Sequence, residues 1–209
     1  MHWISCFWSL ILGGNDPNLF TNFTTKNNNQ TEININYNNK FIPTIIFTKF
    51  LSLTDDCSLT WIKHIHLLEK KLRTTFYLIQ NIKPYMSIST LKIIYHSLFH
   101  SIMSYGIMFW GNSSHSSVIF KIQKRVITII MWYGYRGSCR EVLKEFKILT
   151  LSSQYTFSLL LFFVNKRDYS VHHNINTRWK NNLHLPQISL AMYQMGVYYS
   201  GIKIFNDLP

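Results

Sequence analysis

Hydrophobic residues follow a helical repeat most clearly over residues 87–111. They recur there at steps of three and four, the spacing that places side chains on one face of a helix. These positions are Leu91, Ile94, Tyr95, Leu98, Ile102, Tyr105 and Phe109. Ser87 and Ser89 are suited to cap the start, and Gly106 and Gly111 mark the end. We expect a central helix of roughly 30 Å, against which the other helices pack.

Two more helices flank this segment in the sequence. Thr60 is expected to cap the first, and Pro84 ends it because proline disfavours helical geometry in the residue before it. The second begins at Ser116 or Ser117 and closes at Gly134 and Gly137. Their predicted inward faces are Trp61, Ile65, Leu68, Leu72, Phe76 and Ile79 in the first, and Ile119, Ile122, Val126, Ile129 and Ile130 in the second.

Two further helices are expected towards the C-terminus. Residues 138–141 (SCRE) match a capping box, which predicts a short helix ending near Lys147. Thr150 or Ser152 caps a fifth helix running to about Lys166, and its apolar-all-round centre predicts burial between other helices. Residues 168–184 read as a basic loop, and residues 188–209 as strand or irregular structure.

The N-terminal part has a different pattern. Residues 1–17 show no pattern that joins them to the rest. Ile33, Ile35 and Tyr37 alternate with polar residues, and residues 41–53 form a second β-type run, which together predict an antiparallel hairpin or small sheet. Residues 54–58 read as a polar break. The expected fold is therefore mainly α with a small β element: an N-terminal β-hairpin (within 18–53), a bundle of about five helices (58–167) and a truncated C-terminal segment (168–209).

The charge balance changes this picture from a plain helical domain to one that attracts anions. The 209-residue chain carries 21 Lys and Arg against nine Asp and Glu, a formal charge of +12. Such a chain favours phosphate polyanions or an anionic membrane surface. The cations fall on the predicted outer helix faces, where an ordinary solvated surface is the alternative reading. They are Lys63, Lys70, Lys71, Arg73, Lys121, Lys124, Arg125, Arg136 and Arg140.

The acidic and histidine pairs of the sequence give little indication of a catalytic or metal-binding site. Asp55-Asp56 lacks the aromatic residue that precedes polymerase aspartates, so it reads as a solvated turn before a helix. His96 and His100 have the four-residue spacing of a zinc pair, but Ser97 stands where a metalloprotease helix needs Glu. His64 and His66, two apart, point to different sides of a helix, and we expect all four histidines to be structural or surface residues.

The compartment follows from the cysteines and the apolar stretches. Three widely separated cysteines predict no disulfide framework, so a reducing compartment, nucleus or cytoplasm, is the simpler reading. Residues 157–164 are too short to span a membrane, and no membrane partner is expected. Secretion or membrane anchoring through residues 3–12 is the minority alternative, in which Asn22, Asn29 and Asn112 would be glycosylation sequons.

A series of short motifs in a fixed order resembles a known family. They are 48–53 (TKFLSL), 59–61 (LTW) with 64–65 (HI), 104–107 (SYGI), 109–113 (FWGNS), 123–125 (QKR), 138–141 (SCRE), 148–151 (ILTL), 173–174 (HN) with 176–178 (NTR), and 205–209 (FNDLP). Over about residues 20–209 the chain is similar to the C-terminal part of non-LTR retrotransposon reverse transcriptases, in particular the insect jockey-like elements.

The resemblance implies a role in holding nucleic acid. In that family the catalytic palm, with its aspartates and divalent metals, precedes this region, so the chain as it stands is expected to be no enzyme and to hold no cofactor. Residues 48–53 match the hairpin beside the primer end, which puts Phe50 and Leu51 near the primer; Ser52 stands where the family has glycine. The helices would form the thumb and the region beyond it.

The partners implied are an RNA–DNA template–primer duplex and the missing N-terminal polymerase portion, since both ends look truncated. Phosphate contacts are expected from Lys70, Lys71, Lys121, Lys124 and Arg125. The alternative is an inactive transposon relic with no biochemical role.

Overall fold

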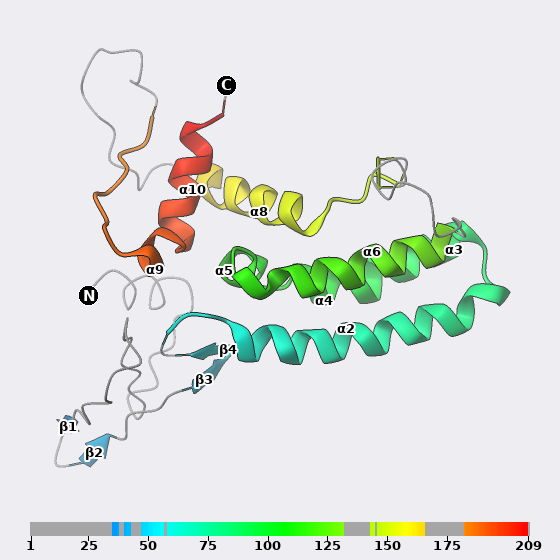
Figure 1. The fold of residues 1–209 in the computed structure, drawn as a ribbon, viewed down its shortest axis with the longest axis horizontal. Helices are drawn as coiled ribbons and strands as arrows, with labels where there is room; N and C mark the ends of the chain where they lie inside the picture. The colour runs from blue at the N-terminus through cyan, green and yellow to red at the C-terminus, as the bar shows by residue number, and fades with distance from the viewer. Residues whose placement is uncertain are drawn as a thin grey trace. The chain divides into compact units, whose positions relative to one another are not determined.

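The computed structural model describes residues 35–37, 40–42, 47–56, 58–131, 143–144, 146–165 and 182–208. The chain divides into two units, residues 1–59 and residues 60–209 (Figure 1). The described residues are mainly helical and an antiparallel hairpin precedes the helices, so the predicted fold class is confirmed. The predictions for residues 1–17, for the helix end at Gly134 and Gly137, for the capping box at 138–141 and for residues 168–181 lie outside the described residues.

The first unit contains two antiparallel hairpins. β1 (Ile35–Tyr37) pairs with β2 (Lys40–Ile42), and β3 (Phe47–Phe50) pairs with β4 (Leu53–Asp56). The turn between β3 and β4 consists of Leu51 and Ser52, whose φ angles of 42° and 66° are both left-handed. Two left-handed residues give the turn a twist that matches the strands. The predicted polar break at residues 54–58 is wrong for residues 54–56, which pair with β3.

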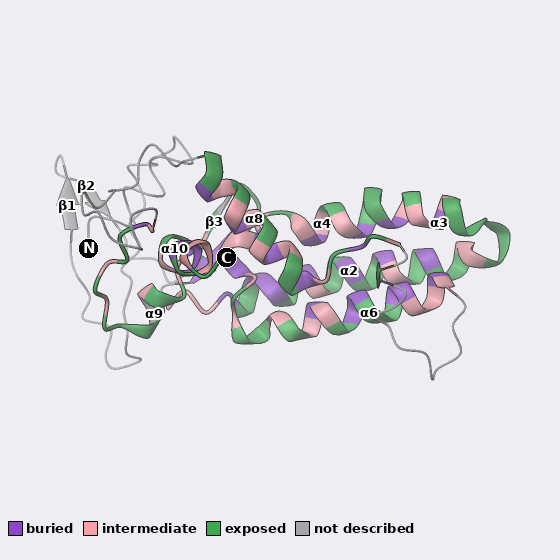
Figure 2. Cartoon of the chain, turned by 90° about the horizontal axis from the view of Figure 1, so that it is seen from above, coloured by how far each residue is buried: buried purple, intermediate pink, exposed green. Residues whose placement is uncertain are grey.

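Three helical segments lie side by side in the second unit. They are α2 (Ile62–Ile82), the continuous run of α3 (Ile88–Ile94), η2 (Tyr95–His100) and α4 (Ser101–Ser104), and α6 (Ser117–Met131). The first and third run in the same direction and pack directly on each other, and the second runs back against both (Figure 1). Figure 2 shows that each helix alternates between buried and exposed positions along its length. The most deeply buried core side chains include Leu72, Leu91, Tyr95, Phe99, Met103, Ile119 and Val126.

Helix α2 begins one residue later than the sequence suggested. Its N-cap is Trp61, in the left-handed region at φ 62°, and no side chain caps it, so the prediction of a Thr60 cap is wrong. Its end is as predicted, because Pro84 lies in the short 3₁₀ turn η1 (Lys83–Tyr85) that follows. The predicted inward residues are buried except Phe76, which is half-buried.

The central helix starts as predicted, since the Ser87 hydroxyl accepts a hydrogen bond from the Thr90 amide at 3.2 Å. It ends earlier, however, because the backbone turns at Tyr105 and Gly106, and Gly106 adopts φ 61°. A separate short helix, α5 (Ile107–Trp110), follows. The predicted single rod over residues 87–111 is therefore wrong at its C-terminal end.

The buried face of this segment also differs from the prediction. Leu91, Tyr95, Phe99 and Met103 are buried in steps of four, whereas Leu98 is exposed. Steps of four drift around an α-helix by about 40° each, because it has 3.6 residues per turn. The π-helical turn of η2 widens the repeat and keeps these residues facing the core.

Helix α6 follows the 3₁₀ turn η3 (Ser114–Ser116), within the predicted start range. Ile119, Ile122, Val126 and Ile130 are buried as predicted, but Ile127 takes the place expected for Ile129. Gln123 is also fully buried, which the sequence pattern did not indicate.

A second group of helices packs on this bundle. α8 (Leu151–Asn165) is capped by Thr150, one of the two predicted residues, whose hydroxyl accepts from the Ser153 amide at 3.2 Å. It contacts α5, α6 and α10. Burial on all sides is wrong, because the side chains of Phe157, Leu161 and Val164 are exposed.

The C-terminal segment is helical rather than strand or irregular. It forms α9 (Ala191–Gln194) and α10 (Val197–Asn206). Gly201 allows α10 to approach α8, because a Cβ atom there would lie only 1.9 Å from Cε2 of Phe163. Gly196 lies in the turn between α9 and α10, and Gly201 provides the close contact between helices.

Candidate nucleic-acid interface

A small depression of about 50 Å³ lies between α2 and α6. Arg73, Phe76 and Tyr77 line it from α2, and Ile122 and Arg125 from α6. The spacings of three and four residues put each set on one side of its helix. The packing of α2 on α6 then brings the two sets together. The result is a shallow site with an arginine on either wall and aromatic rings beside them.

The two arginines differ in their partners. The Arg73 guanidinium donates from Nη2 and Nε to Oε1 of Glu69, at 2.6 Å and 2.9 Å. The Arg73 side chain is 49% exposed, so this pair is a solvent-screened surface contact that contributes little to stability. Within the part of the chain that the structure describes, Arg125 makes no ion pair.

The structure brings together some of the predicted phosphate contacts. Lys121 lies one helical turn before Arg125 on α6, and Lys70 lies three residues before Arg73 on α2; both are exposed. Lys124 is exposed too, but its ammonium sits 4.5 Å from the centroid of the Phe120 ring and therefore away from the depression.

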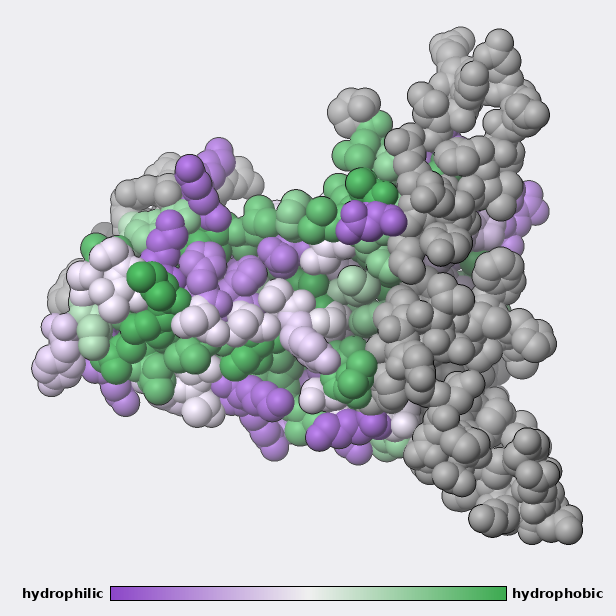
Figure 3. All heavy atoms as spheres, turned by 180° about the vertical axis from the view of Figure 1, so that it is seen from behind, coloured by the Kyte–Doolittle hydropathy of each residue, from purple (hydrophilic) through white to green (hydrophobic). Residues whose placement is uncertain are grey.

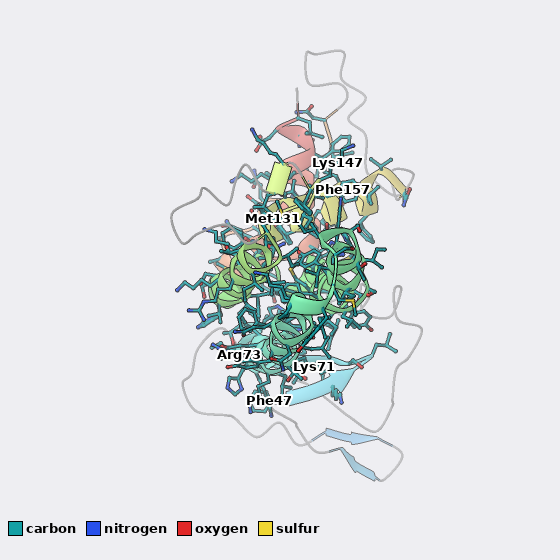
Figure 4. The ribbon with its side chains drawn as sticks, turned by 90° about the vertical axis from the view of Figure 1, so that its right-hand side faces the viewer. Phe47, Lys71, Arg73, Met131, Lys147 and Phe157 are labelled. Atoms are coloured by element: carbon teal, nitrogen blue, oxygen red, sulfur yellow. The ribbon has the colours of Figure 1, made fainter. Side chains whose placement is uncertain are left out.

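Lys71 does not belong to this group. Figure 4 shows Lys71 and Arg73 on opposite sides of α2. Residues two positions apart in an α-helix lie about 160° apart around its axis, which accounts for the separation of Lys71 from Arg73. The Lys71 charge acts instead on His64, whose pKa it helps to lower.

Phe50 and Leu51 belong to the first unit. Leu51 is 57% exposed at the hairpin turn. Their proximity to a primer stays a prediction. Arg73 and Tyr77, in contrast, were not among the predicted contacts. Their role depends on how α2 is rotated against α6, and no local sequence signal reports that rotation.

The paired aspartates are not in a solvated turn. Asp55 and Asp56 lie in β4 and are only 2% and 7% exposed, because strand pairing extends through them. Burial, with the neighbouring Asp56 charge, raises the pKa of Asp55 to about 7. Among the described residues, Oδ1 of Asp55 has no hydrogen-bond partner.

The four histidines differ in their surroundings. His64 is buried beside the rings of Trp61 and Trp110, and burial together with the Lys71 charge lowers its pKa to about 4. His66 is exposed. The His96 and His100 rings lie 5.4 Å apart. In the described ranges, no three His, Cys, Asp or Glu side chains gather as a metal site would require.

The remaining surface shows mixed character. Hydrophobic and hydrophilic side chains are interspersed over the helices on the face seen in Figure 3. None of the helices that the structure describes is both long enough and apolar enough to cross a membrane.

No protein-family profile matches the sequence, and neither a curated protein nor a solved structure shows significant similarity to the chain.

Proposed function

We propose that the chain is a nucleic-acid-binding portion of a non-LTR retrotransposon reverse transcriptase, with the helices of the second unit acting as the thumb that holds a template–primer duplex. The observation that carries this proposal is the depression between α2 and α6, where Arg73 and Arg125 face a common space. Lys70 and Lys121 extend the positive charge by about one helical turn.

Several of the sequence motifs that carry the resemblance contain residues that the fold constrains closely, through an unusual backbone angle, burial or a hydrogen bond. In 104–107, Gly106 adopts the left-handed φ of 61° that turns the chain into α5. In 109–113, Trp110 is buried and donates from Nε1 to the Tyr105 carbonyl at 3.1 Å, while Ser113 donates to the Thr60 carbonyl at 2.8 Å. Motifs tied to such positions support a shared fold.

The hairpin turn supports the same proposal. Ser52 stands where the family has glycine, and its φ of 66° is a conformation that glycine adopts at no steric cost. The backbone shape of a glycine turn is therefore present although the glycine is not. This agrees with the resemblance of residues 48–53 to the primer-side hairpin.

The expected binding is weak and insensitive to sequence. Exposed Lys and Arg contacts to phosphates provide affinity through counterion release, and they carry no direct information about bases. We infer that the chain contributes binding, and that catalysis and its divalent metals belong to a polymerase portion outside it.

Binding of the full chain to a fluorescently labelled RNA–DNA duplex tests the proposal. Anisotropy measured between 50 and 200 mM salt should show an affinity that falls steeply with salt, with a slope of roughly −0.9 for each phosphate contacted. An unlabelled duplex of scrambled sequence should compete equally well. A chain that does not bind at 50 mM salt, or whose affinity is flat with salt, contradicts the proposed function.

A further inference from the structure

Two arginines, Arg73 from α2 and Arg125 from α6, line one depression, and their charge suits an anionic group. The depression is too small for a nucleobase, since about 50 Å³ corresponds to only a few water molecules. Its lining residues include no acid. Guanidinium groups present planar forks of N–H donors that match phosphate oxygens in pairs. A tetrahedral phosphate between Arg73 and Arg125 would satisfy both.

We propose that Arg73, Arg125 and Tyr77 form a clamp for one backbone phosphate of the bound nucleic acid, and that Glu69 holds Arg73 in place while the clamp is empty. This inference rests on the proposed function and names the site at which it operates. Tyr77 is 59% exposed at the rim, where its hydroxyl is available to a phosphate oxygen.

Glu69 acts as an internal stand-in for the phosphate. Both contacts from Arg73 go to one carboxylate oxygen, Oε1, across one helical turn. An exposed pair of this kind is weak, so a phosphate that also engages Arg125 displaces Glu69 readily. The carboxylate therefore keeps Arg73 directed along the helix and lowers the affinity of the clamp.

The row of cations favours a nucleic-acid strand over a membrane surface. Lys121 is one turn before Arg125, and Lys70 is about one turn before Arg73. Because α2 and α6 run in the same direction (Figure 1), each lysine precedes its arginine in the same sense along the two helices. One turn is about 5.4 Å, comparable to the separation of neighbouring phosphates along a strand. A strand can thus pass along the helices with one phosphate in the clamp.

Paired variants of equal charge test the clamp. R73Q/R125Q and K63Q/K71Q each remove two positive charges, but only the first pair lines the depression. We expect R73Q/R125Q to weaken binding of a labelled RNA–DNA duplex by about tenfold or more at 50 mM salt, and K63Q/K71Q by only about two- to threefold. R73K/R125K keeps the positive charge but lacks the planar guanidinium donors, so it should recover only part of the lost duplex affinity.

The role of Glu69 has its own comparison. Glu69→Gln should raise the duplex affinity about threefold, while Asp207→Asn, an equal charge change at an exposed site away from the depression, should leave it nearly unchanged. Equal effects of the two substitutions would show that Glu69 does not restrain the clamp. Circular dichroism of each variant verifies that the helices remain folded.

The outcomes separate the two proposals. A wild-type chain that fails to bind the duplex overturns the proposed function and the clamp with it. A wild-type chain that binds, with R73Q/R125Q no weaker than K63Q/K71Q, overturns the clamp alone. If R73Q/R125Q loses binding only to phosphatidylserine-containing vesicles and not to the duplex, the depression serves a membrane surface and the clamp for nucleic acid is wrong.

Discussion

Gln123 connects three parts of the second unit through one buried amide. Its Nε2 donates to the Tyr95 hydroxyl at 3.1 Å and to the Leu149 carbonyl at 2.9 Å, and its Oε1 accepts from the Leu151 amide at 3.0 Å. Because every polar atom of the side chain is paired, the group can be fully buried without an unsatisfied donor or acceptor. It fixes the start of α8 against α6 and the π-helical turn.

Replacing this amide should be costly. Gln123→Leu leaves the Tyr95 hydroxyl, the Leu149 carbonyl and the Leu151 amide without this partner, the first and last of them in buried hydrogen bonds. We expect a loss of about 2–4 kcal/mol in the free energy of unfolding. Urea denaturation followed by circular dichroism measures it. Gln80→Leu, at an exposed position of α2, is the matched control and should change stability by less than about 0.5 kcal/mol. Similar losses in both variants would contradict the network.

His64 should make the helical unit sensitive to acid. Its pKa of about 4 in the folded chain lies below the ordinary 6.5, so the unfolded chain binds more protons between these values. Its contribution is fully present above pH 6.5 and is lost as pH falls through 4, up to about 3 kcal/mol. His64→Gln should therefore flatten the fall in stability between pH 6.5 and 4, as monitored by the helical signal at 222 nm. An unchanged slope would exclude this role.

Asp55 should give the first unit a pH dependence of stability opposite to the one that His64 gives the second. Its pKa of about 7 exceeds the ordinary 3.8, so its contribution is fully present below pH 3.8 and is lost as pH rises through 7. Asp55→Asn is expected to slow amide hydrogen exchange in β3 and β4 at pH 8 and to have little effect at pH 4. Asp207→Asn, at an exposed site, serves as the control. Equal protection of the hairpin at pH 8 in wild type and Asp55→Asn would refute this assignment.

At the scale of elements, the starts of α3 and α8 were predictable from local chemistry, whereas the Thr60 cap predicted for α2 was wrong. Ser87 and Thr150 cap α3 and α8 because their hydroxyls reach the third residue beyond, a contact within one turn. The π-helical turn was not predictable from spacing, since it is stabilised by burying Phe99 and Met103 rather than by any local preference. The helical tail was not predicted because Gly201 is required by the close packing of the Phe163 ring, and Phe163 is distant from it in the sequence.

The contact between α5 and α8 depends on a missing side chain. A Cβ atom on Gly111 would lie 2.6 Å from the Ile107 carbonyl oxygen and 2.6 Å from Cδ2 of Tyr155. Gly111→Ala should therefore cost about 1–3 kcal/mol through overpacking, as measured by thermal or urea unfolding. Gly196→Ala, which would contact only the Tyr193 backbone, should cost less. A larger loss at Gly196 would argue against a tight α5–α8 contact.

At the scale of the whole molecule, the sequence predicted which cations are exposed but not how they group. Lys71 and Lys70 are adjacent in the chain, yet Figure 4 shows Lys71 on the opposite side of α2 from Arg73. Helix geometry puts Lys70, three residues before Arg73, only about 60° from it around the axis. Grouping requires the rotation of α2 against α6, which follows from the packing of buried residues such as Leu72 and Ile122. A count of charges supplies the overall attraction to phosphates, and the fold decides where it acts.

Cooperative unfolding of the full chain distinguishes a working domain from a relic. The second unit has a continuous core running through α2, the central segment and α6, so we expect one sharp thermal transition in the helical signal. Coincident transitions by circular dichroism and tryptophan fluorescence, to which the buried Trp61 and Trp110 contribute, would support it. A broad, non-coincident melt would favour the relic, and duplex binding would then lose its structural basis.

The π-helical turn gives the central segment an unusual tolerance to change in length. A π turn contains one residue more than the α-helical turn it replaces, so the segment carries a spare residue between Tyr95 and His100. Deleting one residue there would close the widened turn into an ordinary helix, and the residues after it would keep their present faces. Met103 would stay in the core, because the seven remaining α-helical steps from Tyr95 amount to about 700°, close to two full turns. The same deletion in the regular helix α3 would instead rotate everything after it by about 100°, so the central segment tolerates a one-residue deletion at this turn and not elsewhere.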